Sequence, residues 1–187
     1  LDKIESDNLT VIYGDFLSVD LKEVLSKYKG KKLHLIANLP YYITTPIIMK
    51  LLESKIDITS ITVMIQKEVA DRLAEIPGGK NTGAITYTVY YYGEPEKLLE
   101  VPKSSFIPEP SVTSEVIKIN IRKEPPVKVQ NEERFFKLIK VAFLQRRKTL
   151  LNSLTNNGIS NKEELTQLLS KLNIDEKIRS EKLTIDQ

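Results

Sequence analysis

Short apolar runs that end at a turn residue recur along the chain, and such runs predict β-strands. Between them, apolar residues return every three or four positions, which predicts helices. Strands are expected at residues 9–13, 33–37, 56–65, 98–101 and 114–121. Helices are expected at residues 17–25, from residue 44 or 45 onward, in a short segment that follows the third strand and ends at residue 73, and at residues 84–92. This alternation of strands and helices predicts an α/β fold.

Two segments between the predicted strands allow more than one interpretation. Residues 84–92 have a strand-like composition, but the spacing of Ile85, Val89 and Tyr92 is helical. We predict a helix, because strands and helices alternate before this segment. The glycines of residues 77–83 fit neither the Walker nor the dinucleotide spacing, so a mobile loop is expected there rather than a phosphate cradle.

Beyond residue 123 the pattern is helical throughout. Asn131 and the glutamates after it open a helix whose apolar stripe is expected to end near residues 156–158. Ser160 and Glu163 form a capping box for a second helix. We therefore expect a first domain of residues 1–123 followed along the chain by an all-helical domain of residues 124–187, with the boundary at Pro125 and Pro126.

A third capping pattern, Thr184-x-x-Gln187, stands where the sequence stops. A helix start without a helix behind it suggests that the chain is cut short at its C-terminus.

Composition narrows the class of protein. The chain has 187 residues, no cysteine, one histidine, no apolar run of 18 residues and no signal-peptide pattern at its start. Disulfides and cysteine metal sites are excluded, and a metal site or catalytic triad built on histidine is not expected. We expect a cytoplasmic protein with no metal and no membrane partner.

Positive charge is concentrated in the C-terminal part. The chain has 28 Lys and Arg against 25 Asp and Glu, but residues 123–187 hold 13 against 9. Residues 134–148 carry six basic side chains and no acid. Such a run is often only a solvated face, but it also suits contacts with the phosphates of a nucleic acid.

The strand expected at residues 33–37 leads into Asn38-Leu39-Pro40-Tyr41. This sequence suits the methylation of a planar exocyclic amine, whose nitrogen lone pair is delocalised into its ring. The Asn38 side-chain oxygen and the Leu39 carbonyl can accept the two N–H groups, with Pro40 stiffening the corner, while Tyr41 stacks on the ring. The alternative is a simple turn after a strand.

Two further positions have both a functional and a structural interpretation. Asp15 follows the first predicted strand, where it either accepts a hydrogen bond from a ligand amine or caps the next helix. Phe106 precedes Pro108 and Pro110, so its ring lies on a stiff loop. It either contacts a ligand or fills the core.

Four motifs in order along the chain resemble those of the ribosomal RNA adenine dimethyltransferases, and in particular the kasugamycin-sensitivity (small-subunit) dimethyladenosine transferases. They are Gly14-Asp15-Phe16, Asn38-Leu39-Pro40-Tyr41, Phe106-x-Pro108-x-Pro110-x-Val112-x-Ser114, and Gln145-Arg146-Arg147-Lys148-Thr149-Leu150 with Asn152.

The resemblance implies a Rossmann-like class I methyltransferase sheet, S-adenosylmethionine as cofactor, and dimethylation of two adjacent adenosines near the 3′ end of small-subunit rRNA during ribosome biogenesis. Asp15, Phe16 and Asn38 would bind the cofactor. Asn38, Leu39, Pro40, Tyr41 and Phe106 would hold the flipped base and its amine. The resemblance also places Arg146, Arg147 and Lys148 on the face that binds the rRNA of the 30S particle.

The sequence departs from the family at its start. The glycine-rich cofactor loop and the ribose-binding acid of the family would lie upstream of residue 1, and none of the seven glycines of this chain can replace the loop. The resemblance therefore implies a fragment with a sheet incomplete at its N-terminus. For such a fragment we expect no cofactor binding, no activity alone, and association through an open sheet edge.

Two other functions fit parts of the pattern. A macrolide-resistance methyltransferase of large-subunit rRNA shares the Asn38 motif, but the stretch around Arg146 favours the small-subunit class. A non-catalytic RNA-binding or ribosome-assembly factor on the same fold is the third hypothesis.

Overall fold

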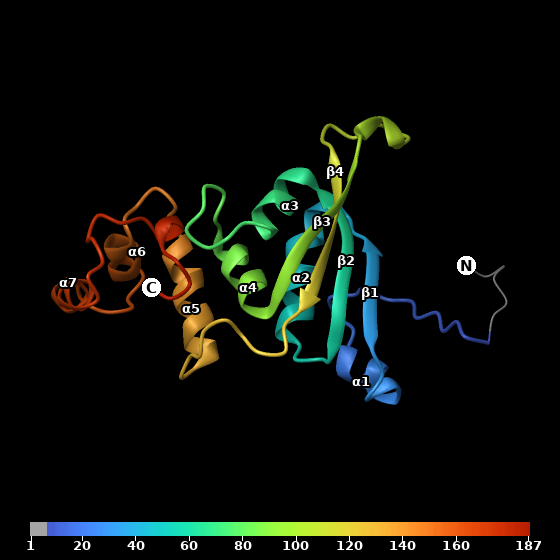
Figure 1. Cartoon of the computed structure of the whole chain (residues 1–187), viewed down its shortest axis with the longest axis horizontal. Coiled ribbons are helices and arrows are strands. Elements are labelled where there is room, and N and C mark those ends of the chain that lie inside the picture. Colours follow the sequence, from blue (N-terminus) through green and yellow to red (C-terminus); the bar gives the residue numbers. More distant parts are fainter. Residues whose placement is uncertain (1–6) are drawn as a thin grey trace.

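The structure, a computed structural model, describes residues 7–187 and is built around one four-stranded mixed sheet (Figure 1). The strands are β1 (Leu33–Asn38), β2 (Ile58–Gln66), β3 (Gly93–Val101) and β4 (Ser114–Ile121), in the spatial order β1-β2-β4-β3. β1 runs parallel to β2, and β4 runs antiparallel to both β2 and β3. The carboxyl ends of β1 and β2 therefore lie at the same edge as the amino end of β4.

Helices α2, α3 and α4 cover one side of this sheet, and α5, α6 and α7 lie beyond α4 (Figure 1). Their bounds are α1 (Leu21–Leu25), α2 (Thr44–Glu53), α3 (Lys67–Leu73), α4 (Ala84–Tyr92), α5 (Glu132–Phe143), α6 (Leu150–Asn156) and α7 (Lys162–Lys171). Short 3-10 turns are η1 (Ser26–Tyr28), η2 (Tyr41–Ile43), η3 (Lys103–Ser105) and η4 (Ser180–Lys182). The predicted helix at residues 84–92 is confirmed. Within residues 7–187 no helix has the length and apolarity to cross a bilayer.

The main core lies between α2 and the sheet. The predicted apolar face of α2 is confirmed, because Ile47, Ile48, Leu51 and Leu52 are all buried. Alternate residues of the two central strands meet this face with no exposed area: Ile61, Val63 and Ile65 of β2, and Ile117 and Ile119 of β4. Burial of this apolar area fixes the register of the strands, since a shift by one residue would turn these side chains outward.

This core gives a direct stability prediction. Ile48 has no exposed area, and its replacement by alanine leaves a cavity between α2 and the sheet. We expect Ile48→Ala to lower the free energy of unfolding by about 2–5 kcal/mol. Urea unfolding measures the change. The same substitution at fully exposed Ile107 should shift the free energy by less than about 0.5 kcal/mol, and a loss as large as that of Ile48→Ala would contradict the assignment of the core.

A second apolar cluster holds α5, α6 and α7 together. It consists of Ala142, Leu150, Leu151, Leu154, Leu165, Leu169 and Ile174. Aromatic contacts connect these helices to α4: Tyr92 stacks on Phe136 with ring centroids 5.3 Å apart, and the hydroxyl of Tyr87 donates to the carbonyls of Ser180 and Leu183. Burial raises the pKa of Tyr87. The C-terminal helices therefore pack directly on the α/β part.

The strand predicted at residues 9–13 is wrong. Residues 9–15 form neither helix nor strand, and Ile12 and Tyr13 are 53% and 77% exposed. In Figure 1 this segment runs out beside β1. A strand requires a neighbour that accepts and donates its backbone hydrogen bonds, and β1 is the edge of the described sheet. β-branched composition alone does not supply that neighbour.

The single long helix predicted from Asn131 to residues 156–158 is also wrong, although its start is confirmed. The Asn131 side chain accepts from the N–H of Arg134, but α5 ends at Phe143 and α6 begins only at Leu150. The helical spacing of apolar residues continues from Phe143 to Leu150, seven positions later, so periodicity alone does not reveal the break between α5 and α6. The break is local: the Thr149 hydroxyl accepts from the N–H of Asn152 and starts a new helix.

The structure confirms one of three predicted caps and moves two predicted strand starts. Thr44 begins α2 instead of capping it, and its hydroxyl donates back to the Pro40 carbonyl. The cap of α7 is Asn161, one residue after the predicted Ser160. The Thr184 pattern is confirmed, because Thr184 and Gln187 exchange backbone and side-chain hydrogen bonds. β3 begins at Gly93, five residues before its predicted start. β2 begins at Ile58, two residues after its own predicted start.

Candidate functional site

The carboxyl end of β1 presents the Asn-Leu-Pro-Tyr sequence at the edge of the sheet. Asn38 is the last residue of β1 and is exposed. The N–H of Leu39 donates to the Met64 carbonyl of β2 over 3.3 Å, and the Leu39 side chain is 8% exposed. The backbone on both sides of the Asn38–Leu39 peptide is therefore anchored, while the Asn38 amide stays open to a ligand.

Tyr41 connects this motif to the start of β4. It begins the turn η2, and its hydroxyl lies 2.6 Å from the hydroxyl of Ser114, which is fully buried. Because Ser114 is the first residue of β4, the bond joins two segments 73 residues apart in sequence. It restrains the Tyr41 ring beside the loop that enters β4.

That loop, residues 102–113, connects β3 to β4 and projects beyond the sheet (Figure 1). It carries the half-buried Phe106, and an ion pair of 3.4 Å between Lys103 and Glu109 spans it. Since β4 starts where β1 and β2 end, the loop lies at the same edge as Asn38 and Tyr41. The structure thus brings the second and third motifs together.

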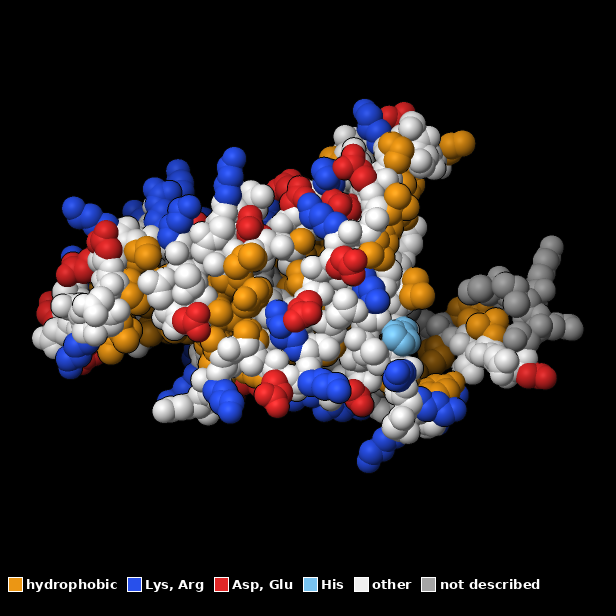
Figure 2. All heavy atoms as spheres, in the orientation of Figure 1, with side chains coloured by type: hydrophobic (Ala, Val, Ile, Leu, Met, Phe, Trp, Pro, Cys, Tyr) orange, Lys and Arg blue, Asp and Glu red, His pale blue; other side chains and the backbone are white. Residues whose placement is uncertain are grey.

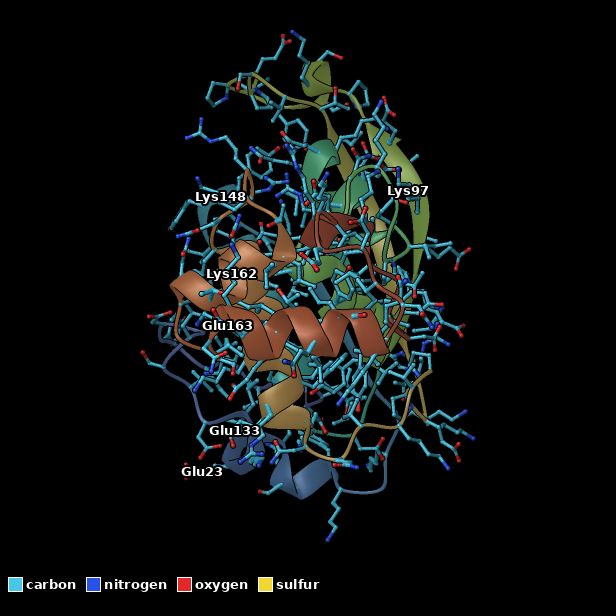
Figure 3. The ribbon with its side chains drawn as sticks, turned by 90° about the vertical axis from the view of Figure 1, so that its left-hand side faces the viewer. Glu23, Lys97, Glu133, Lys148, Lys162 and Glu163 are labelled. Carbon is cyan, nitrogen blue, oxygen red and sulfur yellow. The ribbon has the colours of Figure 1, made fainter. Side chains whose placement is uncertain are left out.

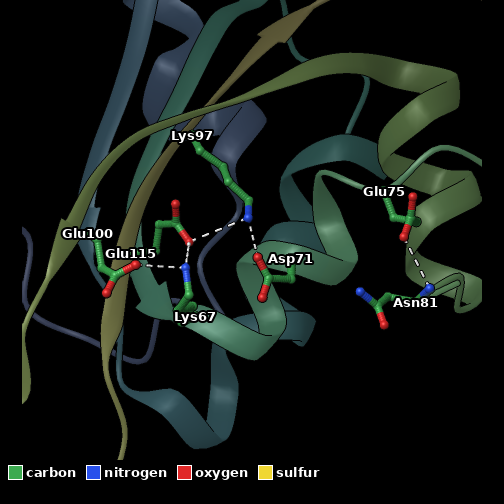
Figure 4. A network of polar contacts seen from close by, with 7 residues as sticks. All are labelled: Lys67, Asp71, Glu75, Asn81, Lys97, Glu100 and Glu115. Carbon is green, nitrogen blue, oxygen red and sulfur yellow. Dashed lines mark hydrogen bonds and ion pairs between the residues drawn. The ribbon is translucent and has the colours of Figure 1, made fainter. Parts of the chain in front are cut away.

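A network of charged side chains supports the base of this loop (Figure 4). The Glu115 carboxylate, whose side chain is 7% exposed, lies 3.4 Å from the Lys67 ammonium and 3.7 Å from that of Lys97. Lys67 also pairs with Glu100 at 2.8 Å, and Lys97 pairs with Asp71. The hydrogen bond to Glu100 raises the pKa of Lys67. The network joins α3, β3 and β4 and so fixes both strands from which the loop emerges.

Asp15 and Phe16 lie in the turn before α1. The Asp15 carboxylate is exposed and accepts from the Leu17 N–H at 2.9 Å and, more weakly, from the Ser18 hydroxyl at 3.4 Å. The helix cap is instead Asp20, so the capping alternative for Asp15 is wrong. The predicted helix start near Leu17 also moves to Leu21. Phe16 is half-buried and packs against the main core.

Arg146, Arg147 and Lys148 are exposed, but they occupy the turn between α5 and α6 and are not on a helix. Figure 2 shows Lys and Arg side chains along the upper edge of this part of the molecule. In Figure 3 Lys148 lies toward the end of the molecule from which the 102–113 loop projects, whereas Glu133 and Glu23 lie toward the other end. The basic turn and the candidate site therefore share one end of the molecule.

No sequence motif predicts a role for Ser114, Glu115 or Lys50. Ser114 was visible only as the last residue of the Phe106 motif. Glu115 follows it as an acid within an apolar strand, a pattern that indicates a buried ion pair. Lys50 interrupts the apolar residues of α2, and its ammonium donates to backbone carbonyls of the turn that carries Asp15.

The fold resembles solved structures of rRNA adenine methyltransferases. A dimethyladenosine transferase from Plasmodium falciparum superimposes with a TM-score of 0.73 at 26% identity, covering 96% of this chain and 70% of that one. The 23S rRNA methyltransferase ErmE superimposes with a TM-score of 0.63 at 19% identity, covering 94% of this chain and 67% of that one, and this likeness shows the fold alone. The mixed α/β architecture with its four-stranded sheet is shared.

Sequence similarity identifies the protein family. The family described as "Ribosomal RNA adenine dimethylase" matches residues 2–187, so the chain belongs to this family. Proteins named ribosomal RNA small subunit methyltransferase A are 50% identical over 182 residues in Clostridioides difficile and 43% identical over 187 residues in Oceanobacillus iheyensis. These alignments cover 97% and 98% of this chain but 63% and 64% of the relatives.

Proposed function

We propose that the protein transfers methyl groups to the exocyclic amines of two adjacent adenosines near the 3′ end of small-subunit rRNA, as a step of ribosome biogenesis. The observation that carries this proposal is the meeting of Asn38, Tyr41 and the Phe106 loop at one sheet edge, with the Tyr41–Ser114 hydrogen bond joining them. The small-subunit names of relatives that are 43–50% identical support the choice of substrate.

The chemistry follows from the anchored backbone at the end of β1. The Asn38 side-chain oxygen and the Leu39 carbonyl accept the two N–H groups of the target amine and draw them out of the plane of the base. The nitrogen lone pair is then less delocalised and points toward the incoming methyl group. No strong base is required, because the methylated amine is acidic enough to lose its proton to water.

The flipped adenine is held between aromatic rings. Tyr41 stacks on one face, and its hydroxyl bond to Ser114 keeps the ring from rotating away. Phe106 stacks on the other face from its loop, which is restrained by prolines and by the Lys103–Glu109 pair. Restraint of both rings before binding lowers the entropy lost when the base enters.

The described residues fit one end of S-adenosylmethionine. The exposed Asp15 carboxylate keeps unused acceptor capacity for the adenine amine, Phe16 follows it in the turn, and the exposed Asn38 amide ends β1. S-adenosylmethionine supplies the methyl group as an electrophile. These three residues then bind and orient its adenine end against the substrate amine.

We further propose a division of labour along the chain. Residues 1–123 belong to a Rossmann-like class I methyltransferase domain, and residues 124–187 form a helical RNA-binding domain with its own apolar cluster. Arg146, Arg147 and Lys148 contact rRNA phosphates near the site. The aromatic contacts between α4 and α5 hold the helix that leads into this basic turn against the α/β part.

The test is methylation of 30S particles that lack the two dimethyladenosines, by a protein spanning the full length of the curated relatives. We expect mass spectrometry of the rRNA to show N6,N6-dimethyladenosine at two adjacent positions. Protein-free 23S rRNA serves as the competing substrate. Methylation of 23S rRNA alone would support the large-subunit alternative, and no methylation of either would support a binding factor.

Phe106→Ala tests the stacking role in the same full-length protein. Stacking contributes about 1–3 kcal/mol per base, so we expect methylation of the 30S particle to fall by about 5- to 150-fold while S-adenosylmethionine affinity is nearly unchanged. Methylation kinetics and calorimetric titration measure the two quantities. Ile107→Ala, on the same loop, is the control. Methylation at the wild-type rate would show that Phe106 only fills the core.

A further inference from the structure

The turn that carries Asp15 and Phe16 is held to the rest of the molecule from α2. Residues 14–19 contain no helix or strand, and their own hydrogen bonds are short-range, such as the one from the Ser18 N–H to the Asp15 carbonyl. Hydrogen bonds of this kind shape the turn but do not set its position. The position must come from contacts with another element.

Lys50 of α2 supplies these contacts. Its ammonium donates to three backbone carbonyls of the turn: that of Phe16 at 3.1 Å, that of Leu17 at 2.6 Å and that of Val19 at 2.6 Å. An ammonium has three N–H donors, so each donor has a partner within the turn. The ammonium also lies 5.9 Å from the centre of the Phe16 ring.

The geometry distinguishes this lysine from one with a merely solvated side chain. Three carbonyls within four residues converge on one point, which requires the backbone of residues 16–19 to wrap around the ammonium. A guanidinium presents its donors in a planar fork and cannot reproduce such a three-way arrangement. The lysine therefore determines which way these carbonyls face and, together with the packing of Phe16 and Val19 against the main core, holds the turn against α2.

The same helix also follows the Asn38 motif. Asn38-Leu39-Pro40 leads through the turn η2 directly into α2, and Thr44 donates back to the Pro40 carbonyl. Lys50 lies in this helix, six residues after Thr44. One helix thus connects the substrate-amine motif at its start with the Asp15 turn near its end.

We propose that Lys50 is a positioning residue that holds Asp15 and Phe16 at a fixed place relative to Asn38 and thereby sets the affinity for the adenine end of the cofactor. The cofactor part of this inference rests on the proposed methyltransferase function. Lys50 touches neither base nor methyl group. It acts through the backbone of the turn.

The structural part is tested on the 187-residue chain by hydrogen exchange. Lys50→Met keeps the apolar stem and removes all three donors. We expect the amides of Leu17 and Ser18 to exchange at least tenfold faster, while amides of β2 and β4 keep their rates. Lys55→Met is the matched control, because Lys55 is exposed and its one ion pair within residues 7–187 is with Glu132 at 3.5 Å. Unchanged exchange at Leu17 and Ser18 would overturn the anchoring role.

The functional part is tested on a protein of the full length of the relatives. For Lys50→Met we expect the KM for S-adenosylmethionine to rise at least tenfold, with kcat at saturating cofactor and the KM for 30S particles changed less than twofold. Lys50→Arg, which retains charge and part of the hydrogen bonding, should recover part of the cofactor KM. It also serves as the second variant if Lys50→Met fails to fold.

The outcomes distinguish a failure of the Lys50 role from a failure of the proposed methyltransferase function. Equal increases in both KM values, or no increase in either, would overturn the role of Lys50 while methylation by the wild type upholds the proposed function. No methylation by the wild type would overturn the proposed function and the cofactor role together. The exchange experiment then still decides whether Lys50 anchors the turn.

Discussion

Replacement of Asn38 by alanine is expected to reduce methyl transfer by about 100- to 1,000-fold, the usual cost of removing one preorganised polar group aimed at charge that develops in the transition state. In the proposed mechanism the target nitrogen gains positive charge as it accepts the methyl group, and the Asn38 oxygen would be one of two acceptors that stabilise this charge. The side chain is exposed at the end of β1, so the substitution leaves the core intact. Single-turnover methylation of 30S particles by the full-length protein measures the effect.

Two controls make the Asn38 result specific. Asn81→Ala removes another exposed amide, in the loop before α4, and should leave the rate unchanged. Asn38→Ala itself should keep the unfolding midpoint of the wild type, since the residue buries little area. A rate within threefold of the wild type would show that the Asn-Leu-Pro-Tyr sequence acts as a turn and not as the amine-binding site.

Simultaneous replacement of Arg146, Arg147 and Lys148 by alanine is expected to weaken binding to the 30S particle and to flatten its salt dependence. Each rRNA phosphate that the protein no longer neutralises lowers the slope of log K against log salt by about 0.7–0.9, so three phosphates amount to roughly 2 units or more. The three side chains are exposed in the turn between α5 and α6, so folding should be unaffected. Filter binding at several salt concentrations gives the slope.

The chain offers a control with the same change in charge. Lys29, Lys31 and Lys32 are exposed in the loop between η1 and β1, and their replacement by alanine also removes three positive charges. A general effect of net charge would flatten the salt dependence equally in both triple variants. If residues 146–148 bind phosphates, the slope of log K against log salt should change much more in the variant that lacks Arg146, Arg147 and Lys148. Equal slopes in the two triple variants would contradict this role.

Periodicity and local hydrogen bonding in the sequence determined much of the fold. The apolar run of β1, the alternation in β4, the buried face of α2 and the Asn131 cap all depend on residues close together in the chain. Four motifs also indicated the family, which the match over residues 2–187 confirmed. The roles of individual site residues remain predictions, because they depend on ligands.

Only the tertiary structure decided the rest. The apolar run at residues 9–13 did not become a strand because strand formation requires a partner from elsewhere in the fold. The Tyr41–Ser114 hydrogen bond and the three Lys50 hydrogen bonds join residues 73 and 31–34 positions apart. No local pattern encodes such pairs, since they meet only after the parallel and antiparallel strands have packed into one sheet and α2 has docked against it.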